Sequence, residues 1–255
     1  MVRSLIPLII LNPLSPLNPL IIYKLNMKAT INFLKELSAN NDREWFNAHK
    51  DEYQKVKAFI EEFTSTLISR ITEFDPEASR LSPSDCLYRI YRDTRFSADK
   101  TPYKTHIGIY INPRGGKKSE YCGYYVHIEP GACMVGGGAW YPPAPLLKEY
   151  RSEIYNNIEE YLEIMENPEF AANYKPLWTD PLKTAPKGFP KDWEYIDLLK
   201  PRSFTVGASF TDREFCAKGI SDRIISLFKI LKPYNDFFNF TLEEHPELAF
   251  CRPKR

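Results

Sequence analysis

The sequence predicts an α+β fold, in which a mainly antiparallel sheet of four to six strands is flanked by N-terminal and C-terminal helices. Three observations support this prediction. Apolar residues recur at spacings of three and four over 29–74, which is typical of amphipathic helices. Apolar and polar residues then alternate between 86 and 138, in short runs joined by turns. Helical spacing returns after residue 140. Strands that follow one another through short connections pair antiparallel, which favours a meander.

The N-terminal helical region is expected to form two segments. Thr30 is a candidate N-cap for the first helix, and the Asn-Asn-Asp sequence at 40–42 ends that helix and caps the next. The apolar pattern from Trp45 to Ile71 predicts a long amphipathic helix that ends before Pro76.

The predicted strands cover 86–92, 105–111, 121–129 and 132–138, and a further strand returns at 203–210. The glycine run at 136–138 lies inside the last strand of the meander. It lacks the spacing of a phosphate-binding loop and the helix that should follow, so we interpret it as a strand kink or a packing site.

Helices are expected again in the C-terminal half. One begins at Pro143 or Pro145 and is continued over 158–165. The proline-rich stretch 173–193 predicts a surface loop, followed by a short helix over 193–199. The last helix, 221–240, is expected to be interrupted at Pro233, because proline has no N–H to donate.

The composition is that of one ordinary globular domain, with 255 residues, 43% hydrophobic and 26% charged. We expect the domain at 27–245, preceded by an unstructured extension or a mis-assigned gene start at 1–26 and followed by a C-terminal tail at 246–255. The first 26 residues are apolar, but their four prolines would break a spanning helix. The small-residue cleavage site of a targeting signal is also missing.

The overall charge disfavours two classes of partner. The chain has 34 basic and 33 acidic residues, so its net charge of +1 gives no long-range attraction to nucleic acid or membrane. Five cysteines without a Cys-x-x-Cys spacing predict reduced thiols and a cytoplasmic location rather than disulfides. No cofactor is predicted, and no metal site, because His106 and His127 lack a carboxylate at a clear spacing.

Positive charge is concentrated in one segment. Residues 86–118 contain eight basic side chains and two acids, a local charge of +6. Arginine binds carboxylate or phosphate through two parallel donors, and lysine adds a mobile point charge, so this pattern predicts an anion site. The two aspartates could orient the arginines or act as acid or base. The predicted ligand-binding residues are Arg89, Arg92, Arg95, Lys100, Tyr103, Lys104 and Trp140, and the predicted catalytic residues are Asp93, Asp99 and His127.

The segment Arg89-x-Tyr-Arg-Asp-x-Arg-Phe-Ser-x-Asp-Lys-x-Pro-Tyr-Lys104, preceded by Asn-Asp-Arg-Glu-Trp-Phe at 41–46, resembles the uncharacterised bacterial and fungal family catalogued as domain of unknown function 2461. Further similar segments are 123–130, 136–140 and 186–189, so the resemblance covers roughly 29–240. It implies a single conserved domain and favours a site at 89–104, but it brings no activity.

Three functions remain open from the sequence. The first is binding of an anionic, phosphate- or carboxylate-bearing small molecule, with or without catalysis. The second is an interaction or scaffold protein, in which the arginines and aspartates form a structural network. The third is single-stranded nucleic-acid binding through the aromatic residues between the basic ones, which the near-neutral net charge disfavours without excluding.

Overall fold

A five-stranded antiparallel sheet forms the centre of the computed structural model, which describes residues 26–177 and 180–249. The strand order is β1-β2-β3-β5-β4. The strands are β1 (Ile107–Ile111), β2 (Tyr124–Ile128), β3 (Cys133–Ala139), β4 (Lys175–Pro176) and β5 (Phe204–Phe210). The predicted α+β class is confirmed. The predicted N-terminal extension, apart from Asn26, lies outside the described residues.

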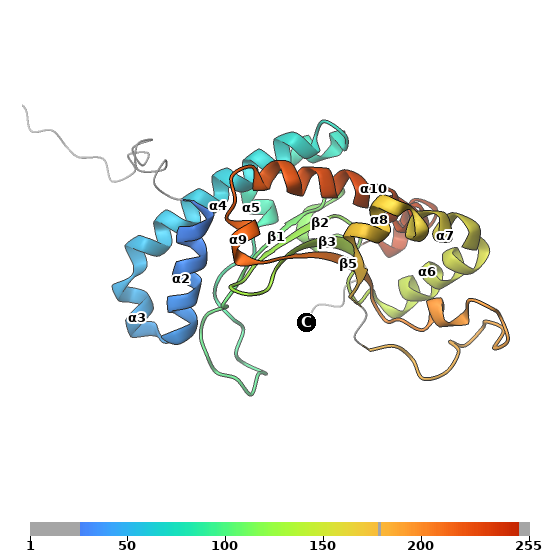
Figure 1. The fold of residues 1–255 in the computed structure, drawn as a ribbon. Coiled ribbons are helices and arrows are strands. Elements are labelled where there is room, and N and C mark those ends of the chain that lie inside the picture. The colour runs from blue at the N-terminus through green and yellow to red at the C-terminus, as the bar shows by residue number, and fades with distance from the viewer. Residues whose placement is uncertain (1–25, 178–179, 250–255) are drawn as a thin grey trace, which may run out of the picture.

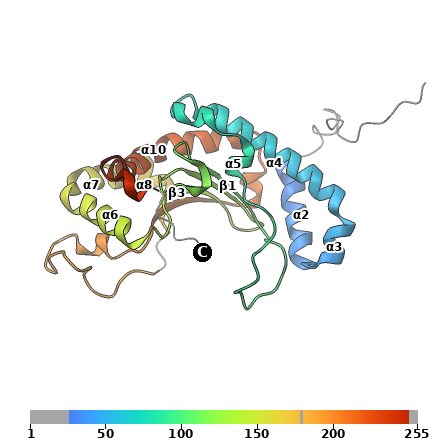
Figure 2. The ribbon, with the colours of Figure 1, turned by 180° about the vertical axis from the view of Figure 1, so that it is seen from behind.

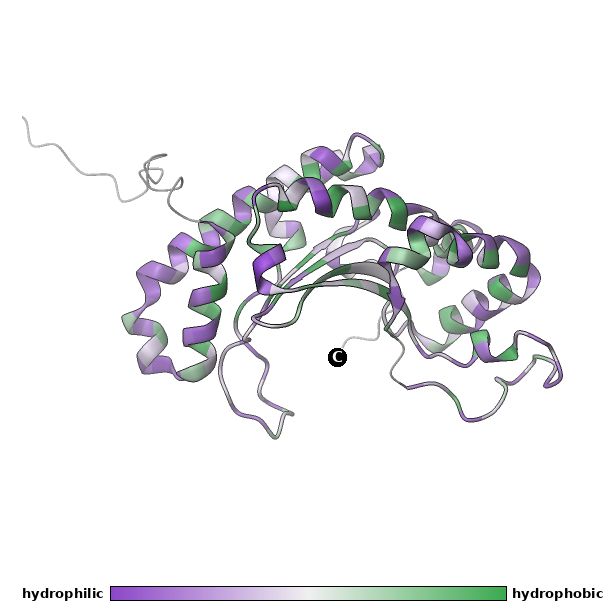
Figure 3. Ribbon diagram, viewed as in Figure 1, coloured by the Kyte–Doolittle hydropathy of each residue, from purple (hydrophilic) through white to green (hydrophobic). Residues whose placement is uncertain are grey.

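Helices before and after the strands pack together on one face of the sheet (Figures 1 and 2). Figure 3 shows hydrophobic and hydrophilic residues on different sides of these helices. None of the helices within the described residues has the length and apolar character needed to cross a bilayer. The helices are α2 (Met27–Ala39), α3 (Arg43–Ala48), α4 (Lys50–Ile71), α5 (Pro83–Cys86), α6 (Ala144–Asn156), α7 (Ile158–Glu166), α8 (Pro168–Asn173), α9 (Asp212–Phe215) and α10 (Ile220–Glu244), with short 3₁₀ turns η1 (Pro76–Arg80), η2 (Gly116–Lys118), η3 (Ile196–Leu199) and η4 (Pro246–Leu248).

The long C-terminal helix α10 is tied to the sheet by two buried asparagines one turn apart. The Asn235 side chain donates to the carbonyl of Gly123 at 3.0 Å and accepts from the N–H of Gly138 at 2.9 Å. Asn239 makes the same pair of bonds with the backbone of Cys122, at 3.1 and 2.6 Å. A Cβ on Gly137 would lie 2.5 Å from a backbone oxygen and 2.9 Å from the Asn235 amide, so glycine is required for this close contact.

Two helix predictions differ from the structure. The N-cap of α2 is Asn26, whose side chain accepts from the N–H of Ala29 at 3.1 Å, and Thr30 is buried inside the helix. The last helix is not interrupted at Pro233, which lies within a continuous α10. Proline removes one backbone hydrogen bond there, but buried apolar residues on both sides of it, including Leu231 and Phe237, hold the helix against the core.

Residues 86–92 do not form the regular strand that the alternation predicted. Cys86 ends α5, and only Leu87 and Tyr91 form bridges, to Ile109 and Tyr103. With the first bridge as reference, Tyr91 would face residue 105 in a regular ladder. It faces Tyr103 instead. The N–H of Lys104 donates to the carbonyl of Ile90 and the N–H of Tyr88 to that of Gly108, so the stretch 105–107 bulges out of this pairing. Such a bulge re-aims the side chains that it contains.

The face of the sheet opposite the helices is concave. Tyr124 packs against Phe74 and Phe228 on the helix side, so its neighbours Tyr125 and His127 point to the concave side. Figures 1 and 2 show the hairpin around residues 93–101 descending at one end of this face and the segment after β4 descending at the other.

The first part of the predicted C-terminal tail packs on the domain. Residues 246–248 form η4, and the carbonyl of Ala249 accepts from the N–H of Glu120 at 3.0 Å. Among the cysteines that the structure describes, Cys86, Cys122, Cys133 and Cys216 are free thiols.

Candidate functional site

The basic hairpin, residues 89–104, is anchored to the N-terminal helices by the side chain of Asn41. This amide donates to the carbonyl of Tyr103 at 3.0 Å and accepts from its N–H at 3.1 Å. The Tyr103 ring stacks on Phe46 with 4.0 Å between the ring centres, and only 4% of Tyr103 is exposed. Tyr103 was predicted to bind ligand, but its burial and packing fit an anchor for the hairpin.

Both aspartates of the hairpin are paired with its arginines. Asp99 accepts hydrogen bonds from Arg92 and from the N–H and hydroxyl of Thr101. Asp93 accepts two parallel bonds from Arg95, at 2.9 and 2.7 Å.

These bonds hold the pKa of both carboxyl groups at about 2. The Arg95 side chain is the main cause for Asp93, and the N–H of Thr101 followed by Arg92 is the main cause for Asp99. A carboxylate with so low a pKa is a poor base near neutrality. The geometry therefore favours the orienting role over the catalytic role among the two predicted for Asp93 and Asp99.

Three further predicted ligand-binding residues lie at the surface without meeting one another in a pocket. Arg95 is 76% exposed and lies over the Phe96 ring at 5.8 Å. The Lys100 ammonium donates to the carbonyl of Thr94 at 2.9 Å. Trp140 is 62% exposed, beyond the end of β3. Two surface hollows of about 330 and 450 Å³ contain none of the predicted site residues.

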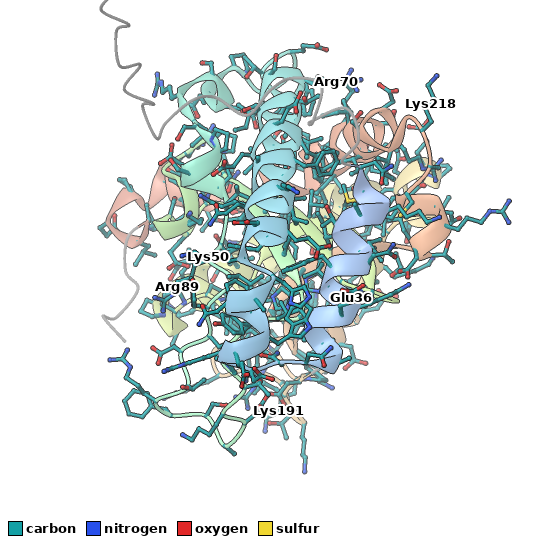
Figure 4. All side chains as sticks on the ribbon, turned by 90° about the vertical axis from the view of Figure 1, so that its left-hand side faces the viewer. Glu36, Lys50, Arg70, Arg89, Lys191 and Lys218 are labelled. Carbon is teal, nitrogen blue, oxygen red and sulfur yellow. The ribbon has the colours of Figure 1, made fainter. Side chains whose placement is uncertain are left out.

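Arg89 and Lys104 differ from the two arginines of the hairpin that bind aspartates. Like Lys100, which donates to a carbonyl, neither has a carboxylate within 4.0 Å among residues 26–177 and 180–249. Lys104 is half-buried, with its ammonium 5.4 Å from the centre of the Tyr88 ring, and the ammonium of Lys117 lies 5.9 Å from the same ring. Burial lowers the pKa of Lys104, and the positive charge of Arg89 lowers it further. Figure 4 labels Arg89 at the surface above the hairpin.

A second group of side chains, which we call the histidine cluster, lies beside Lys104 on the concave face. His106 comes from the bulge before β1, and its ring stacks on His127 of β2 with 4.6 Å between the centres. His127 Nε2 lies 3.0 Å from Glu129 Oε2, and its Nδ1 lies 2.9 Å from the Tyr125 hydroxyl. The other Glu129 oxygen accepts from the Thr105 hydroxyl at 3.0 Å.

The cluster shifts the pKa of three of its members. Burial lowers the pKa of His106 to about 4, and the neighbouring His127 and Lys104 contribute. Burial would raise the pKa of Glu129, but the hydrogen bonds from His127 and Thr105 outweigh it and lower the pKa. Burial, followed by the neighbouring Tyr88 and Glu129, raises the pKa of Tyr125 to about 12, so its hydroxyl is protonated near neutrality.

Gly108 leaves room for two aromatic side chains on this part of the sheet. It is the cross-strand neighbour of His127. A Cβ on Gly108 would lie 3.1 Å from the Tyr125 hydroxyl and 3.1 Å from the Tyr88 ring. The missing side chain therefore provides the room in which Tyr88 and Tyr125 meet.

From the sequence, His106 and His127 were considered as metal ligands and rejected, and Tyr125, Glu129 and Thr105 were missed. The signal that could have found two of them is the alternation in β2, which places residues 125, 127 and 129 on one face. The prediction of no metal site rested on a missing carboxylate, and Glu129 supplies one.

Comparison with known proteins identifies the family alone. The family model described as "Conserved hypothetical protein (DUF2461)" matches residues 29–237. No curated protein and no solved structure matches the chain.

Proposed function

The chain belongs to the DUF2461 family, and from its site we propose that it binds an anionic small molecule, phosphate- or carboxylate-bearing, at Arg89 and Lys104. The observation that carries this proposal is the contrast within one hairpin. Arg92 and Arg95 each bind an aspartate and Lys100 donates to the carbonyl of Thr94. The Arg89 and Lys104 side chains have neither a carboxylate nor a hydrogen-bond partner among the described residues.

Two neighbouring cations that no carboxylate contacts are unfavourable for folding, and more so where one is half-buried. The lowered pKa of Lys104 reflects this, because burial and the charge of Arg89 both disfavour the charged ammonium. A bound anion would remove this penalty through charge-assisted hydrogen bonds, in which arginine offers a planar fork and lysine a point charge. Functional sites often contain charge arrangements of this kind, which lower the stability of the folded protein in the absence of ligand.

The paired residues have a supporting role in this proposal. Arg92 with Asp99, and Arg95 with Asp93, fix the shape of the hairpin, while Asn41 and Phe46 hold its base. Arg92, Arg95, Lys100 and Trp140 then contact a ligand only if it extends beyond the two unpaired cations.

The test is binding of inorganic phosphate, pyrophosphate and citrate, measured by isothermal titration calorimetry in the presence of an uncharged chelator. Arg89→Ala and Lys104→Met are each expected to weaken binding by about 10- to 100-fold, the worth of one charge-assisted hydrogen bond. The matched control is Arg70→Ala, which removes an arginine outside the hairpin that already has a carboxylate partner, Asp222, and it is expected to bind within about twofold of wild type. Absence of binding to the wild-type chain, or equal affinity in Arg89→Ala, would refute the proposal.

Thermal unfolding separates this function from the scaffold alternative. If Lys104 binds a ligand, Lys104→Met removes a half-buried cation and is expected to raise the melting temperature without ligand. If Arg89 and Lys104 belong to a structural network, their replacement lowers the melting temperature and leaves every ligand-dependent shift unchanged. A labelled single-stranded oligonucleotide at low salt tests the third function, since phosphate contacts are strongest there.

A further inference from the structure

His106, His127 and Glu129 each direct one potential metal-ligating atom to a common point on the concave face. These three atoms lie within 4.8 Å of one another. No other group of three or more histidine, cysteine, aspartate or glutamate side chains approaches in this way within the part of the chain that the structure describes. Two imidazoles and one carboxylate are a donor set used by divalent transition metals.

The separation of His127 Nε2 and Glu129 Oε2, 3.0 Å, fits two ligands of one ion. Atoms that each lie about 2.1 Å from a metal and subtend a right angle are about 3.0 Å apart. His106 must come closer than it lies here. It precedes β1 within the bulge and outside the regular ladder, so its ring can turn toward the other two without breaking strand pairing.

Two of the three ligands, His127 and Glu129, are already held by hydrogen bonds on the side that faces away from the common point. His127 Nδ1 is bonded to the Tyr125 hydroxyl at 2.9 Å, and the second Glu129 oxygen accepts from Thr105 at 3.0 Å. With Nε2 on a metal, Nδ1 carries the ring proton and donates a hydrogen bond to the Tyr125 oxygen. Hydrogen bonds of this kind orient metal ligands and fix the histidine tautomer, and they are a regular part of metal sites.

We propose that His106, His127 and Glu129 bind one divalent transition metal ion, such as zinc, manganese or iron(II), on the concave face beside Lys104. Imidazole ligands favour these ions over magnesium and calcium, which prefer oxygen. Three protein ligands leave coordination positions open to water or to an oxygen of an anion. None of the metal ligands belongs to the basic hairpin, so the metal site does not rest on the anion site proposed above.

The test uses the full chain, freed of metal and of any affinity tag, titrated with Zn²⁺ by calorimetry and with Co²⁺ by visible absorption. We expect one equivalent of each ion to bind, and a cobalt spectrum that reports nitrogen and oxygen ligands. His127→Gln and Glu129→Gln are expected to weaken Zn²⁺ binding at least 10-fold. Thr105→Val, which keeps all three ligands but removes a supporting hydrogen bond, is expected to weaken it about 10- to 100-fold.

The matched control is His245→Gln. His245 lies 3.5 Å from Glu247, the same two residue types at the same spacing, but without a second histidine. It is expected to leave Zn²⁺ affinity unchanged. The proposal is overturned if the wild-type chain binds no stoichiometric Zn²⁺, or if His127→Gln and Glu129→Gln variants with wild-type circular dichroism bind it as tightly. Because the anion titration is made with a chelator present, failure of one proposal leaves the other intact.

Discussion

The two buried asparagines of α10 allow a stability prediction with a definite magnitude. Asn235 is 2% exposed and satisfies two backbone groups, the carbonyl of Gly123 and the N–H of Gly138. Asn235→Ala leaves both groups buried and unpaired. Each such group costs about 1–3 kcal/mol, so the free energy of unfolding is expected to fall by about 2–6 kcal/mol. Asn239→Ala leaves the two backbone groups of Cys122 unpaired, and its free energy of unfolding is expected to fall by a similar amount.

The assay is urea unfolding followed by circular dichroism, with the slope of the transition compared between variants. The control is Ser226→Ala on the exposed side of the same helix, where the hydroxyl returns to the carbonyl of Asp222. Its unfolding free energy is expected to stay within about 0.5 kcal/mol of wild type. A loss of less than about 1 kcal/mol in Asn235→Ala, at an unchanged slope, would show that these bonds do not tie the helix to the sheet.

Two further predictions concern the basic hairpin. Asn41→Ala removes both hydrogen bonds to Tyr103, each worth about 1 kcal/mol, so local opening and trypsin cleavage within 89–104 are expected to become about 30-fold faster. Asn40→Ala, whose amide returns to its own helix, should leave the cleavage rate unchanged, and equal rates in the two variants would contradict the anchor. Asp93 and Asp99 are expected to titrate near pH 2 when their carboxyl carbons are followed by NMR. Since their folded pKa lies below the unfolded value, their stabilising contribution is complete above about pH 4 and is lost toward pH 2. Midpoints at the ordinary value near 4 would show that the arginine pairs do not persist in solution.

Local patterns in the sequence predicted most of the sheet, because a strand with one buried face alternates with period two. The α10 prediction failed at Pro233 for a tertiary reason. The penalty for a proline is local, but the apolar residues that hold the helix act through contacts with the rest of the core. The irregular pairing around residue 105 was equally hidden, because the sequence does not give the register of a bulged pair.

The candidate site was predictable only in part, because it also depends on contacts that form in the folded chain. Charge density alone pointed to the basic hairpin, but it could not separate Arg89 and Lys104 from the arginines that bind neighbouring aspartates. That distinction depends on side-chain geometry. The contact between His106 and His127 depends on strand pairing, and the carboxylate beside them follows from alternation in β2.

The asparagines at 235 and 239 also limit how this molecule can move. A helix packed only through apolar side chains can slide along a sheet by small steps at little cost. Here a slide of α10 would break four buried hydrogen bonds at once, and the lost bonds would find no substitutes in the new position. The helix layer and the sheet should therefore behave as one rigid plate. Any adjustment to a bound molecule then falls to the hairpin at its margin, which is held by Asn41 and a stacked ring pair rather than by a ladder.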